Sequence, residues 1–575
     1  MRDIKNIMNN TLIKSKEEKC FNIFVYGGLI GGLLFIILYG FKILNPSYLD
    51  WTYQGGDLVQ HQLGWEAFRN SRWNFPIGLH DGLIYPSKIS VIYTDSIPIF
   101  AIIFKCFSSV LPINFQYMGI YGLLCFILHG GFSALLVHKF INNIFISLIS
   151  VPLFIYNSVL IYRMFAHTAL ASQWIILAAW CIWIYKDRFM SYKKLVLLWS
   201  ILMFLAPCIH MYFVPMLGLM LLFFCMFYYY QTKKLRHALM IFIVPCILAI
   251  LVIYVLGAFY NMGGDTLGLD CDIFTVNLNN FINPISVDHS GRVSLFLKPL
   301  QAHFGAYEGR CYLGLGLIIS LIYIVFYNIY SYIKHHDKKS YISLHPMRFF
   351  ILLVCIVLFI LSLGLTVRLG ATSAVTKIWY PMFIIKILSI YRCLGRFIWP
   401  VYYMIFLYVI KKYKEIMKSK INFIICITLL VLINILDHSG MLIDYHKYYV
   451  SDFKYESLLT DPIWDKIKKN KNHIMLMDDM TIDDVLIDNC LKIGKDLIKN
   501  GNTLNKFYLA RYPEETINKN TIEVEKGLLN SHLDDNMICI YKENRENDIF
   551  TQFEENFDVY YANGYIIVCN KGYLN

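Results

Sequence analysis

Apolar runs of about 20 residues recur along most of this 575-residue chain, and no other feature of the sequence restricts its fold as strongly. A helix needs roughly 20 residues to cross the hydrocarbon core of a bilayer. Hydrophobic residues make up 57% of the chain and charged residues only 16%, a balance too apolar for a soluble protein of this length. The sequence therefore predicts an α-helical integral membrane protein with many spans.

Short clusters of Lys and Arg separate the predicted membrane segments. Cytoplasmic loops carry an excess of these residues, so the clusters at 186–194, 233–236, 334–339 and 411–420 are predicted to lie in the cytoplasm. The net charge of +12 therefore reflects topology, and we expect no nucleic-acid partner because no binding motif accompanies it. The predicted membrane segments lie near residues 21–43, 91–111, 117–138, 142–161, 168–185, 194–208, 211–230, 238–260, 313–333, 348–364, 397–413 and 421–437.

The basic segment 1–20 is predicted to be a cytoplasmic tail, because the apolar run behind it is too long for a signal peptide and has no cleavage site. A cytoplasmic tail and a cytoplasmic cluster at 186–194 require an even number of crossings, yet five apolar segments lie between them. One segment therefore does not cross. We expect it to be 91–111, which begins with polar residues around Asp95; the alternative is 142–161.

This topology divides the chain into a multi-span membrane domain, 21–437, and a C-terminal domain, 438–575. The membrane domain has a first external loop at 44–90 and a long external loop at 261–312. After Asp437 the composition becomes charged and mixed, which predicts a small extracytoplasmic α/β domain.

Helix-like and strand-like patterns follow one another in the C-terminal domain. We expect a helix near 482–500 and strands at His473–Met477, at Met537–Tyr541 and within Asp558–Val568. The dipeptide Asn563-Gly564 lies between two alternating runs of the last segment and is typical of a type I′ hairpin.

Ionisable residues other than loop lysines gather on the predicted external side. Charged groups are costly near a membrane, so this grouping predicts that the functional face is external. The candidate site residues are Asp57, His61, Asp95, Arg163, His167, His210, Glu308, Arg392 and Arg396.

Asp57 has two interpretations. It precedes an amphipathic stretch and has the spacing of a capping box with Gln60, which predicts a helix N-cap. It is also a candidate general base, because Gly55 and Gly56 let backbone and substrate approach closely and His61 lies one helical turn further along the same face. The two roles are compatible.

The next candidates also have structural alternatives. Asp95 is either a cap or a second acid that positions the acceptor or a metal. Arg163 and His167 are spaced i, i+4 and would share a helical face, although an arginine at a helix end commonly reaches towards the membrane interface. His210 stands alone, which is typical of a buried histidine as well as of a binding residue.

Arg392 and Arg396 form a second i, i+4 pair, where an external loop enters a membrane segment. If they converge they form a phosphate clamp, because a guanidinium group presents paired donors and keeps its charge. Otherwise they anchor the segment at lipid headgroups. Glu308 either contributes to this site or pairs with its neighbour Arg310.

The 15 cysteines show no CxxC pair and no metal-binding spacing. Most lie inside apolar runs, where cysteine behaves as a small hydrophobic residue. Cys271 and Cys311 flank the long external loop and are either two thiols or a disulfide.

Carboxylates, histidines and arginine pairs on one membrane face suit an anionic, lipid-linked substrate. Transfer of a sugar from a polyprenyl phosphate needs a base for the acceptor hydroxyl, cations for the departing phosphate and a groove open to lipid. The candidate residues can supply the base and the cations.

In the segments that carry these residues, the chain resembles GT-C type glycosyltransferases. It more closely resembles a bacterial family of multi-span proteins, DUF6311, which is related to that superfamily and to the YfhO-like membrane proteins. The matching segments span most of the chain: Gly55-Gly56-Asp57, Gln60-His61, Gly64-Trp65, Trp73–Gly78, Asp95–Pro98, Tyr307–Gly309, Tyr312–Gly316, Gly395–Phe397 and Tyr508–Arg511.

The resemblance implies a GT-C type multi-span bundle and a polyprenyl-phosphate sugar donor. It also implies that a carboxylate of the first external loop, here Asp57, is the base or a metal-site residue. GT-C enzymes differ in their need for a divalent cation. Asp57 is followed by Leu58 rather than by a second acid, so we assign no metal ligands.

We therefore expect a glycosyltransferase of the bacterial cytoplasmic (inner) membrane that acts on a cell-envelope glycan, lipid or polymer acceptor at the external face. Asp57 and Asp95 would be catalytic, and the other candidates would bind substrate. The alternatives are a lipid-linked glycan ligase or polymerase, and a transporter or flippase of envelope precursors. A transporter is expected to carry ionisable residues at the bilayer centre and inverted repeats, and neither is evident in the sequence.

Overall fold

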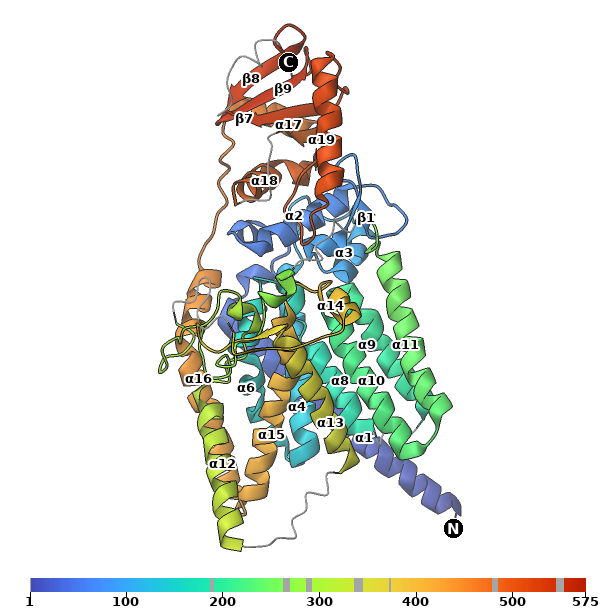
Figure 1. Cartoon of the computed structure of the whole chain (residues 1–575), viewed down its shortest axis with the longest axis vertical. Helices are drawn as coiled ribbons and strands as arrows, with labels where there is room; N and C mark the ends of the chain where they lie inside the picture. The colour runs from blue at the N-terminus through green and yellow to red at the C-terminus, as the bar shows by residue number, and fades with distance from the viewer. Residues whose placement is uncertain are drawn as a thin grey trace.

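The computed structural model is mostly helical and has a small sheet region at its C-terminal end (Figure 1). It describes residues 2–186, 191–261, 269–285, 292–335, 345–371, 374–477, 484–543 and 553–574. Within these ranges nine helical stretches are long and apolar enough to cross a membrane, as a multi-pass membrane protein requires. They are Glu18–Tyr39, Met118–Ile141, Thr168–Tyr185, Tyr192–Ile209, Phe213–Thr232, Leu235–Val255, Leu315–Lys334, Leu394–Ile416 and Lys420–Val450.

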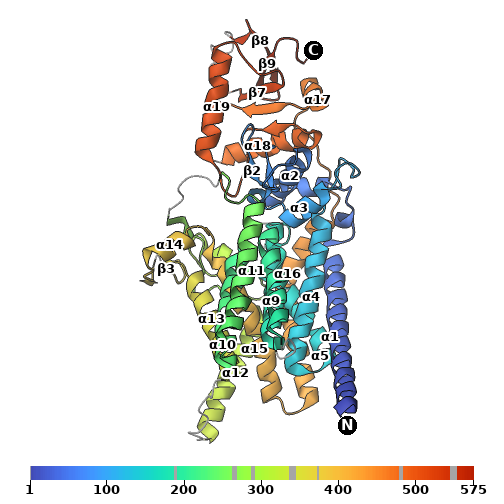
Figure 2. The same ribbon diagram turned by 90° about the vertical axis from the view of Figure 1, so that its right-hand side faces the viewer.

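The helices that contain these stretches run along one another in a bundle (Figures 1 and 2). Gly31 allows a close approach of two helices, because a Cβ at this position would lie 2.2 Å from the carbonyl oxygen of Phe126 in the neighbouring helix. The bundle helices are α1 (Arg2–Tyr39), α4 (Met118–Ile141), α8 (Trp174–Tyr185), α9 (Tyr192–Ile209), α10 (Phe213–Thr232), α11 (Leu235–Val255), α12 (Leu315–His335), the shorter α13 (Pro346–Ser362), α15 (Trp399–Ile416) and α16 (Lys420–Val450).

The segment 91–111 forms one short helix, α3 (Pro98–Lys105). Its eight residues are about 12 Å long, too short for a hydrocarbon core of about 30 Å. Figure 2 shows α3 at the end of the bundle nearest the C-terminal sheet, which we call the sheet end. The segment before α4 also stays at this end, because the Gln116 N–H donates to the carbonyl oxygen of Pro46.

The alternative segment, 142–161, forms three short helices in succession. It starts at the end of the bundle opposite the sheet, where Lys414 Nζ donates to the carbonyl oxygen of Phe140. It leads to the sheet end, where His167 contacts Asp57. This segment therefore runs from one end of the bundle to the other, whereas 91–111 stays at the sheet end. The three helices are α5 (Ile144–Ile149), α6 (Val151–Ile155) and α7 (Ser158–Arg163).

Short elements join the helices of the bundle. They are the two-stranded ribbons β1 (Leu79–His80) with β2 (Ile89–Ser90) and β3 (Thr366–Val367) with β4 (Thr376–Lys377), the helix α14 (Met382–Leu388), and the 3-10 turns η1 (Lys42–Leu44), η2 (Asp50–Tyr53), η3 (Val91–Thr94), η4 (Thr168–Ala171), η6 (Leu269–Asp272), η7 (Ala306–Gly309) and η8 (Leu394–Ile398). A further 3-10 turn, η9 (Ile498–Asn500), lies in the C-terminal region.

The C-terminal region forms a five-stranded sheet of order β6-β5-β7-β9-β8. The first three strands in this order are parallel and the last three antiparallel. Asn563 and Gly564 both have positive φ, which confirms the predicted hairpin. The elements are β5 (His473–Leu476), β6 (Thr503–Leu504), β7 (Met537–Lys542), β8 (Phe557–Ala562), β9 (Tyr565–Asn570), α17 (Pro462–Lys469), α18 (Asp484–Leu497) and α19 (Glu514–Leu529).

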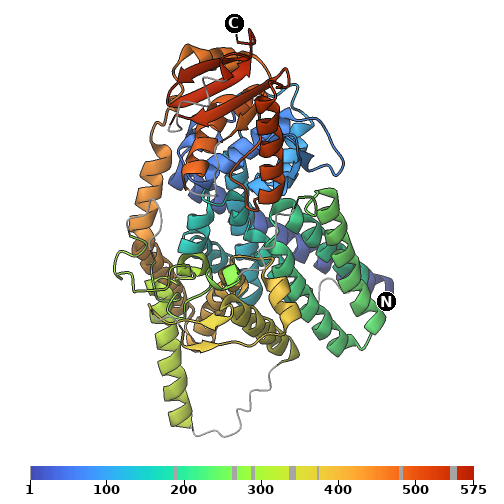
Figure 3. The ribbon, with the colours of Figure 1, turned by 45° about the horizontal axis from the view of Figure 1, so that its top comes forward.

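The helix α2 (Asp57–Asn70) joins the bundle to this sheet region. Leu58 and Trp65 belong to the hydrophobic core of the bundle. Val59 and Leu63, on another face of α2, belong to the hydrophobic core of the C-terminal region. Figure 3 shows the α2 segment, in blue, beneath the C-terminal elements, in orange and red. The first predicted external loop and the C-terminal domain are therefore packed together.

The structure refines two sequence expectations. Helix α16 continues to Val450, so the helical part of the chain extends beyond Asp437. Within the described ranges the cysteines form no disulfide, and Cys271 and Cys311 are buried thiols.

Candidate functional site

Most of the candidate residues lie at the sheet end of the bundle, below the C-terminal region. Six of them come from the end of a helix or from a short turn. The positions are the start of α2 for Asp57, the turn after η3 for Asp95, the turn after α7 for His167, the end of α9 for His210, η7 for Glu308 and η8 for Arg396.

Asp57 does not cap its helix. Gly56 occupies the N-cap position with φ of 64°, and no side chain makes a capping hydrogen bond. The carboxylate instead lies 2.9 Å from His167 Nδ1 and accepts a hydrogen bond of 3.1 Å from the hydroxyl group of Tyr508. Gln60, the expected capping partner, donates to the carbonyl oxygen of Tyr508. The N-cap interpretation is therefore wrong.

The surroundings of Asp57 favour its ionised form. Burial raises the pKa of this carboxyl, but His167, His61 and the Tyr508 hydroxyl lower it by more, so the pKa lies below its usual value. His167 Nδ1 is also 2.7 Å from the carbonyl oxygen of Ala166. Because both neighbours of Nδ1 are oxygen acceptors, this nitrogen carries the proton.

Asp95 and His210 form a second carboxylate–histidine pair, with 3.3 Å between Oδ1 and Nε2. The backbone N–H of Tyr212 donates to His210 Nδ1, so the proton of the neutral imidazole is on Nε2 and faces Asp95. Burial raises the pKa of the Asp95 carboxyl, but His210 and His61 lower it by more, so the pKa lies below its usual value. Burial lowers the pKa of His210 more than Asp95 raises it. The pair therefore consists of a carboxylate and a neutral imidazole.

His61 is fully buried between these groups. Its Nδ1 lies 3.3 Å from the Thr168 hydroxyl group, and its Nε2 has no hydrogen-bond partner among the residues the structure describes. Burial lowers the pKa of His61 to about 4, although Asp95 and Asp57 oppose this shift. His61 is therefore neutral at pH 7.

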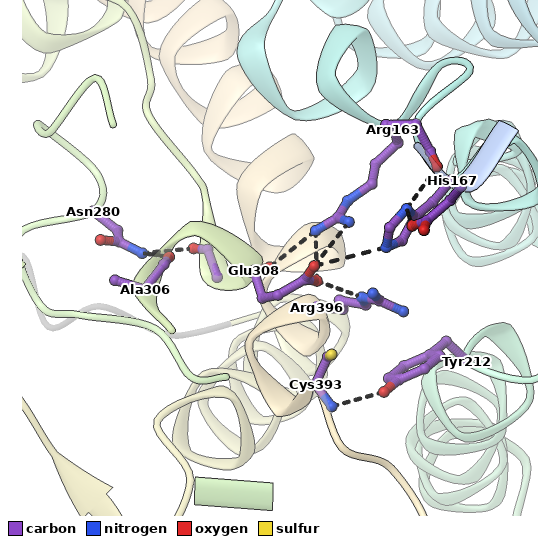
Figure 4. A network of polar contacts seen from close by, with 11 residues as sticks. Arg163, His167, Tyr212, Asn280, Ala306, Glu308, Cys393 and Arg396 are labelled. Carbon is purple, nitrogen blue, oxygen red and sulfur yellow. Dashed lines mark hydrogen bonds and ion pairs between the residues drawn. The ribbon is translucent and has the colours of Figure 1, made fainter. Parts of the chain in front are cut away.

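Glu308 lies at the centre of a buried ion-pair cluster, shown in Figure 4. Its carboxylate accepts hydrogen bonds from Arg163 Nη1 at 3.2 Å and Nη2 at 2.7 Å, and from Arg396 Nε at 2.8 Å. Burial raises the pKa of this carboxyl, but the two arginines lower it far below its usual range. The alternative, an ion pair with Arg310, does not occur in the described residues; the Arg310 guanidinium lies over the Tyr162 ring, 4.2 Å from its centroid.

An asparagine holds the turn that carries Glu308. Asn280 Nδ2 donates to the carbonyl oxygens of Ala306 and Gly309, at the two ends of η7. The contact between Asn280 and Ala306 is visible at the left of Figure 4. The side chain of Glu308 is thus fixed by its turn as well as by the arginines.

Arg163 and His167 do not share a helical face. Helix α7 ends at Arg163, and His167 follows after a turn. Both side chains nevertheless reach Glu308, since His167 Nε2 lies 3.8 Å from its Oε1. Arg163 is only 1% exposed, so it does not reach towards the membrane interface.

Within the described part of the chain Arg392 and Arg396 share no hydrogen-bond or ion-pair partner. They are not on one helical turn, because η8 begins at Leu394. Arg396 is buried with its guanidinium over the Tyr212 ring, and its terminal nitrogens make no hydrogen bond within the described residues. Arg392 is exposed and lies over the Phe274 ring. The structure thus brings Arg396 into the cluster and leaves Arg392 at the surface.

Tyr508 contacts Asp57 and Tyr212 lies against Arg396, but neither tyrosine was in the predicted site. Neither has a local signal of function. Tyr508 lies in the C-terminal region, although its segment Tyr508–Arg511 is among those that carry the family resemblance. Among the described residues no three His, Cys, Asp or Glu side chains are placed to hold a metal ion. A described cavity of about 710 Å³ is lined by Asn279, Leu300 and Leu369 among others, and by none of the candidate residues.

Two family models match the chain. The model described as "Domain of unknown function (DUF6311)" matches residues 28–439, and the "DUF6311 C-terminal domain" matches residues 463–571. The first contains all the predicted site residues and the second contains Tyr508. A search of curated proteins gives no match to the chain.

Proposed function

Since the chain belongs to the DUF6311 family, whose description names no function, we propose its activity from the site: it is a membrane glycosyltransferase of GT-C architecture. It would transfer a sugar from a polyprenyl-phosphate donor to a cell-envelope glycan, lipid or polymer acceptor. The reaction would take place at the external face of a bacterial cytoplasmic membrane.

The observation that carries the proposal is the environment of Asp57. Its side chain is 26% exposed, while His167 and Tyr508 hold its two oxygens. An ionised carboxylate that is both oriented and accessible is suited to accept a proton from an acceptor hydroxyl. Asp57 is therefore our candidate for the general base.

In this mechanism the acceptor oxygen attacks the anomeric carbon of the donor sugar. Its proton passes to Asp57, and the bond between the anomeric carbon and the phosphate oxygen breaks with its electron pair on the phosphate. Asp95, held by His210, would help to position the acceptor, and His61 would support both aspartates from the interior.

The leaving phosphate needs positive charge, and the arginines supply it. Glu308 neutralises one of its two arginine partners, so the Arg163–Glu308–Arg396 cluster keeps a net positive charge. The terminal nitrogens of Arg396 remain available to bind an anion, because only its Nε is bonded to Glu308. Arg392, close to Arg396 in the sequence, carries an exposed positive charge. We assign both to the donor phosphate.

The test is transfer by purified Asp57→Asn protein in lipid nanodiscs. The amide keeps the shape of the side chain but is not a base, so we expect at least a hundredfold loss of transfer. Asp50→Asn is the matched control, since Asp50 lies in the same segment and forms no ion pair within the described residues; it should behave as wild type. Wild-type turnover by Asp57→Asn would overturn the proposal.

The donors in this test are polyprenyl monophosphate-linked and diphosphate-linked sugars, supplied in parallel. Turnover of the monophosphate supports a glycosyltransferase of the proposed type. Turnover of the diphosphate alone would make the chain a ligase or polymerase of lipid-linked glycans.

A further inference from the structure

The loop between β6 and α19 in the C-terminal region reaches the membrane domain at several points. The Tyr508 hydroxyl group donates to Asp57 Oδ1 at 3.1 Å, and Gln60 Nε2 donates to the Tyr508 carbonyl oxygen at 2.8 Å. The next contacts are a 2.8 Å hydrogen bond from the Ala510 N–H to the carbonyl oxygen of Tyr93 and one from Arg511 to Ile390.

This loop is held in place by a larger contact behind it. Val59 and Leu63 of α2 pack in one hydrophobic cluster with Ile493 and Leu497 of α18. Asn70, at the end of α2, donates to the carbonyl oxygen of Ile498. The C-terminal region therefore rests on the same helix that begins with Asp57.

The two oxygens of Asp57 have different partners. Oδ2 faces His167 and Oδ1 accepts from Tyr508, so the carboxylate is fixed about its side-chain torsions. Burial and the neighbouring Asp57 raise the pKa of the Tyr508 phenol, which therefore stays protonated and remains a donor.

We propose that the C-terminal domain completes the site, with Tyr508 as a positioning residue that orients Asp57. The role of Asp57 as base rests on the proposed function, whereas its orientation by Tyr508 does not. The domain would thus be a component of the reacting centre and not an appended module.

The proposal can be tested through the protonation of Asp57. The groups that face this carboxyl are His167, His61 and Tyr508. A hydrogen bond to the ionised form lowers a carboxyl pKa, so its removal raises that pKa. Tyr508→Phe should therefore make Asp57 protonated at a higher pH, a change that a purely structural role would not produce.

The experiment uses the full-length protein in nanodiscs and a water-soluble carbodiimide with an amine, which modify the protonated carboxyl. Labelling of Asp57 is measured by mass spectrometry across a pH series. We expect the midpoint to rise by about one pH unit in Tyr508→Phe. In Tyr512→Phe the midpoint should not move, because the Tyr512 hydroxyl group lies in the same loop as Tyr508 but makes no contact with Asp57.

An unchanged midpoint in a folded Tyr508→Phe protein would overturn the proposal. If this variant does not fold, Gln60→Met provides a second test, because it withdraws the hydrogen bond that holds the Tyr508 backbone. The midpoint should then rise in the same direction, and a wild-type midpoint would again contradict the proposal. Labelling requires no substrate, so the two proposals can fail separately. If the midpoint shifts in Tyr508→Phe but Asp57→Asn still transfers sugar, the proposed function is rejected and the orientation of Asp57 by Tyr508 is not.

Discussion

Oδ2 of Asp57 lies 2.9 Å from Nδ1 of His167, and the other nitrogen of this imidazole faces Glu308. One histidine thus lies between the proposed base and the buried arginine cluster. A change in the charge of Glu308 is therefore expected to alter the electrostatic environment of Asp57 as well as that of the arginines.

Glu308→Gln removes the charge between Arg163 and Arg396. Breaking a buried ion pair while its partners remain costs about 3–5 kcal/mol, so we expect a clear loss of stability in thermal unfolding of the nanodisc-bound protein. Glu415→Gln is the control, because Glu415 is 43% exposed where it pairs with Lys412, and it should cost less than about 1 kcal/mol. Equal unfolding temperatures for Glu308→Gln and wild type would contradict the buried cluster.

His61 makes stability depend on pH. Its pKa of about 4 in the folded protein lies below the ordinary value of about 6.5, so between these values the unfolded chain binds a proton that the folded chain does not. Stability should therefore fall as the pH drops from about 6.5 to about 4, by up to about 3 kcal/mol from this residue. We expect His61→Gln to lose less stability than wild type over this range in denaturant titrations.

The control for this titration is His532→Gln. His532 is 81% exposed and should leave the pH profile as in wild type. Parallel profiles for His61→Gln and wild type would show that His61 is not held neutral by burial.

Gly64→Ala should disturb the segment that carries Asp95. A Cβ at Gly64 would lie 2.3 Å from Thr94 Oγ1 and 2.6 Å from Ser96 Oγ, so α2 and this segment must separate. Overpacking of this kind typically costs about 1–3 kcal/mol, measurable as a lower unfolding temperature. Gly218→Ala in α10 is the control, because nothing lies within 4 Å of its Cβ position and stability should not fall. Equal effects of the two substitutions would contradict the close contact.

Arg392→Gln should separate binding from stability. The side chain is exposed, so the unfolding temperature should stay within the error of wild type, while affinity for a polyprenyl phosphate should fall about three- to tenfold, or roughly 0.7–1.4 kcal/mol. Equilibrium binding in detergent micelles at low salt measures this. Lys386→Gln, in α14, is a nearby control that should bind as wild type. If Arg392→Gln binds the polyprenyl phosphate with unchanged affinity, Arg392 does not belong to the phosphate-binding site.

Composition and local pattern were enough for much of the fold. The membrane helices follow from apolar runs of about 20 residues, the length that a helix needs to cross a bilayer. The hairpin follows from Asn563-Gly564, because a type I′ turn needs positive φ at both residues and Asn and Gly adopt it most readily. The counting of crossings also predicted that 91–111 does not cross, and the α-helix in this segment has only eight residues.

The partners within the site could not be predicted in this way. Spacing of i, i+4 implies a shared face only inside a helix, and both arginine-containing pairs lie where a helix has ended or not yet begun. Glu308 binds Arg163 rather than Arg310 because the fold brings α7 to η7, which no local pattern specifies. The segment of α2 was predicted to be amphipathic, but the sequence did not indicate that two separate cores would share its apolar residues.

The position of α2 between two cores has a consequence for how the protein is made. Val59 and Leu63 are translated long before Ile567, a member of the same core. Until the C-terminal strands have been made, this face of α2 lacks part of its core, and Tyr508 cannot reach Asp57 before it is itself translated. A chain truncated after α16 would therefore leave the apolar face of α2 without its C-terminal partners and Asp57 without one of its two supports.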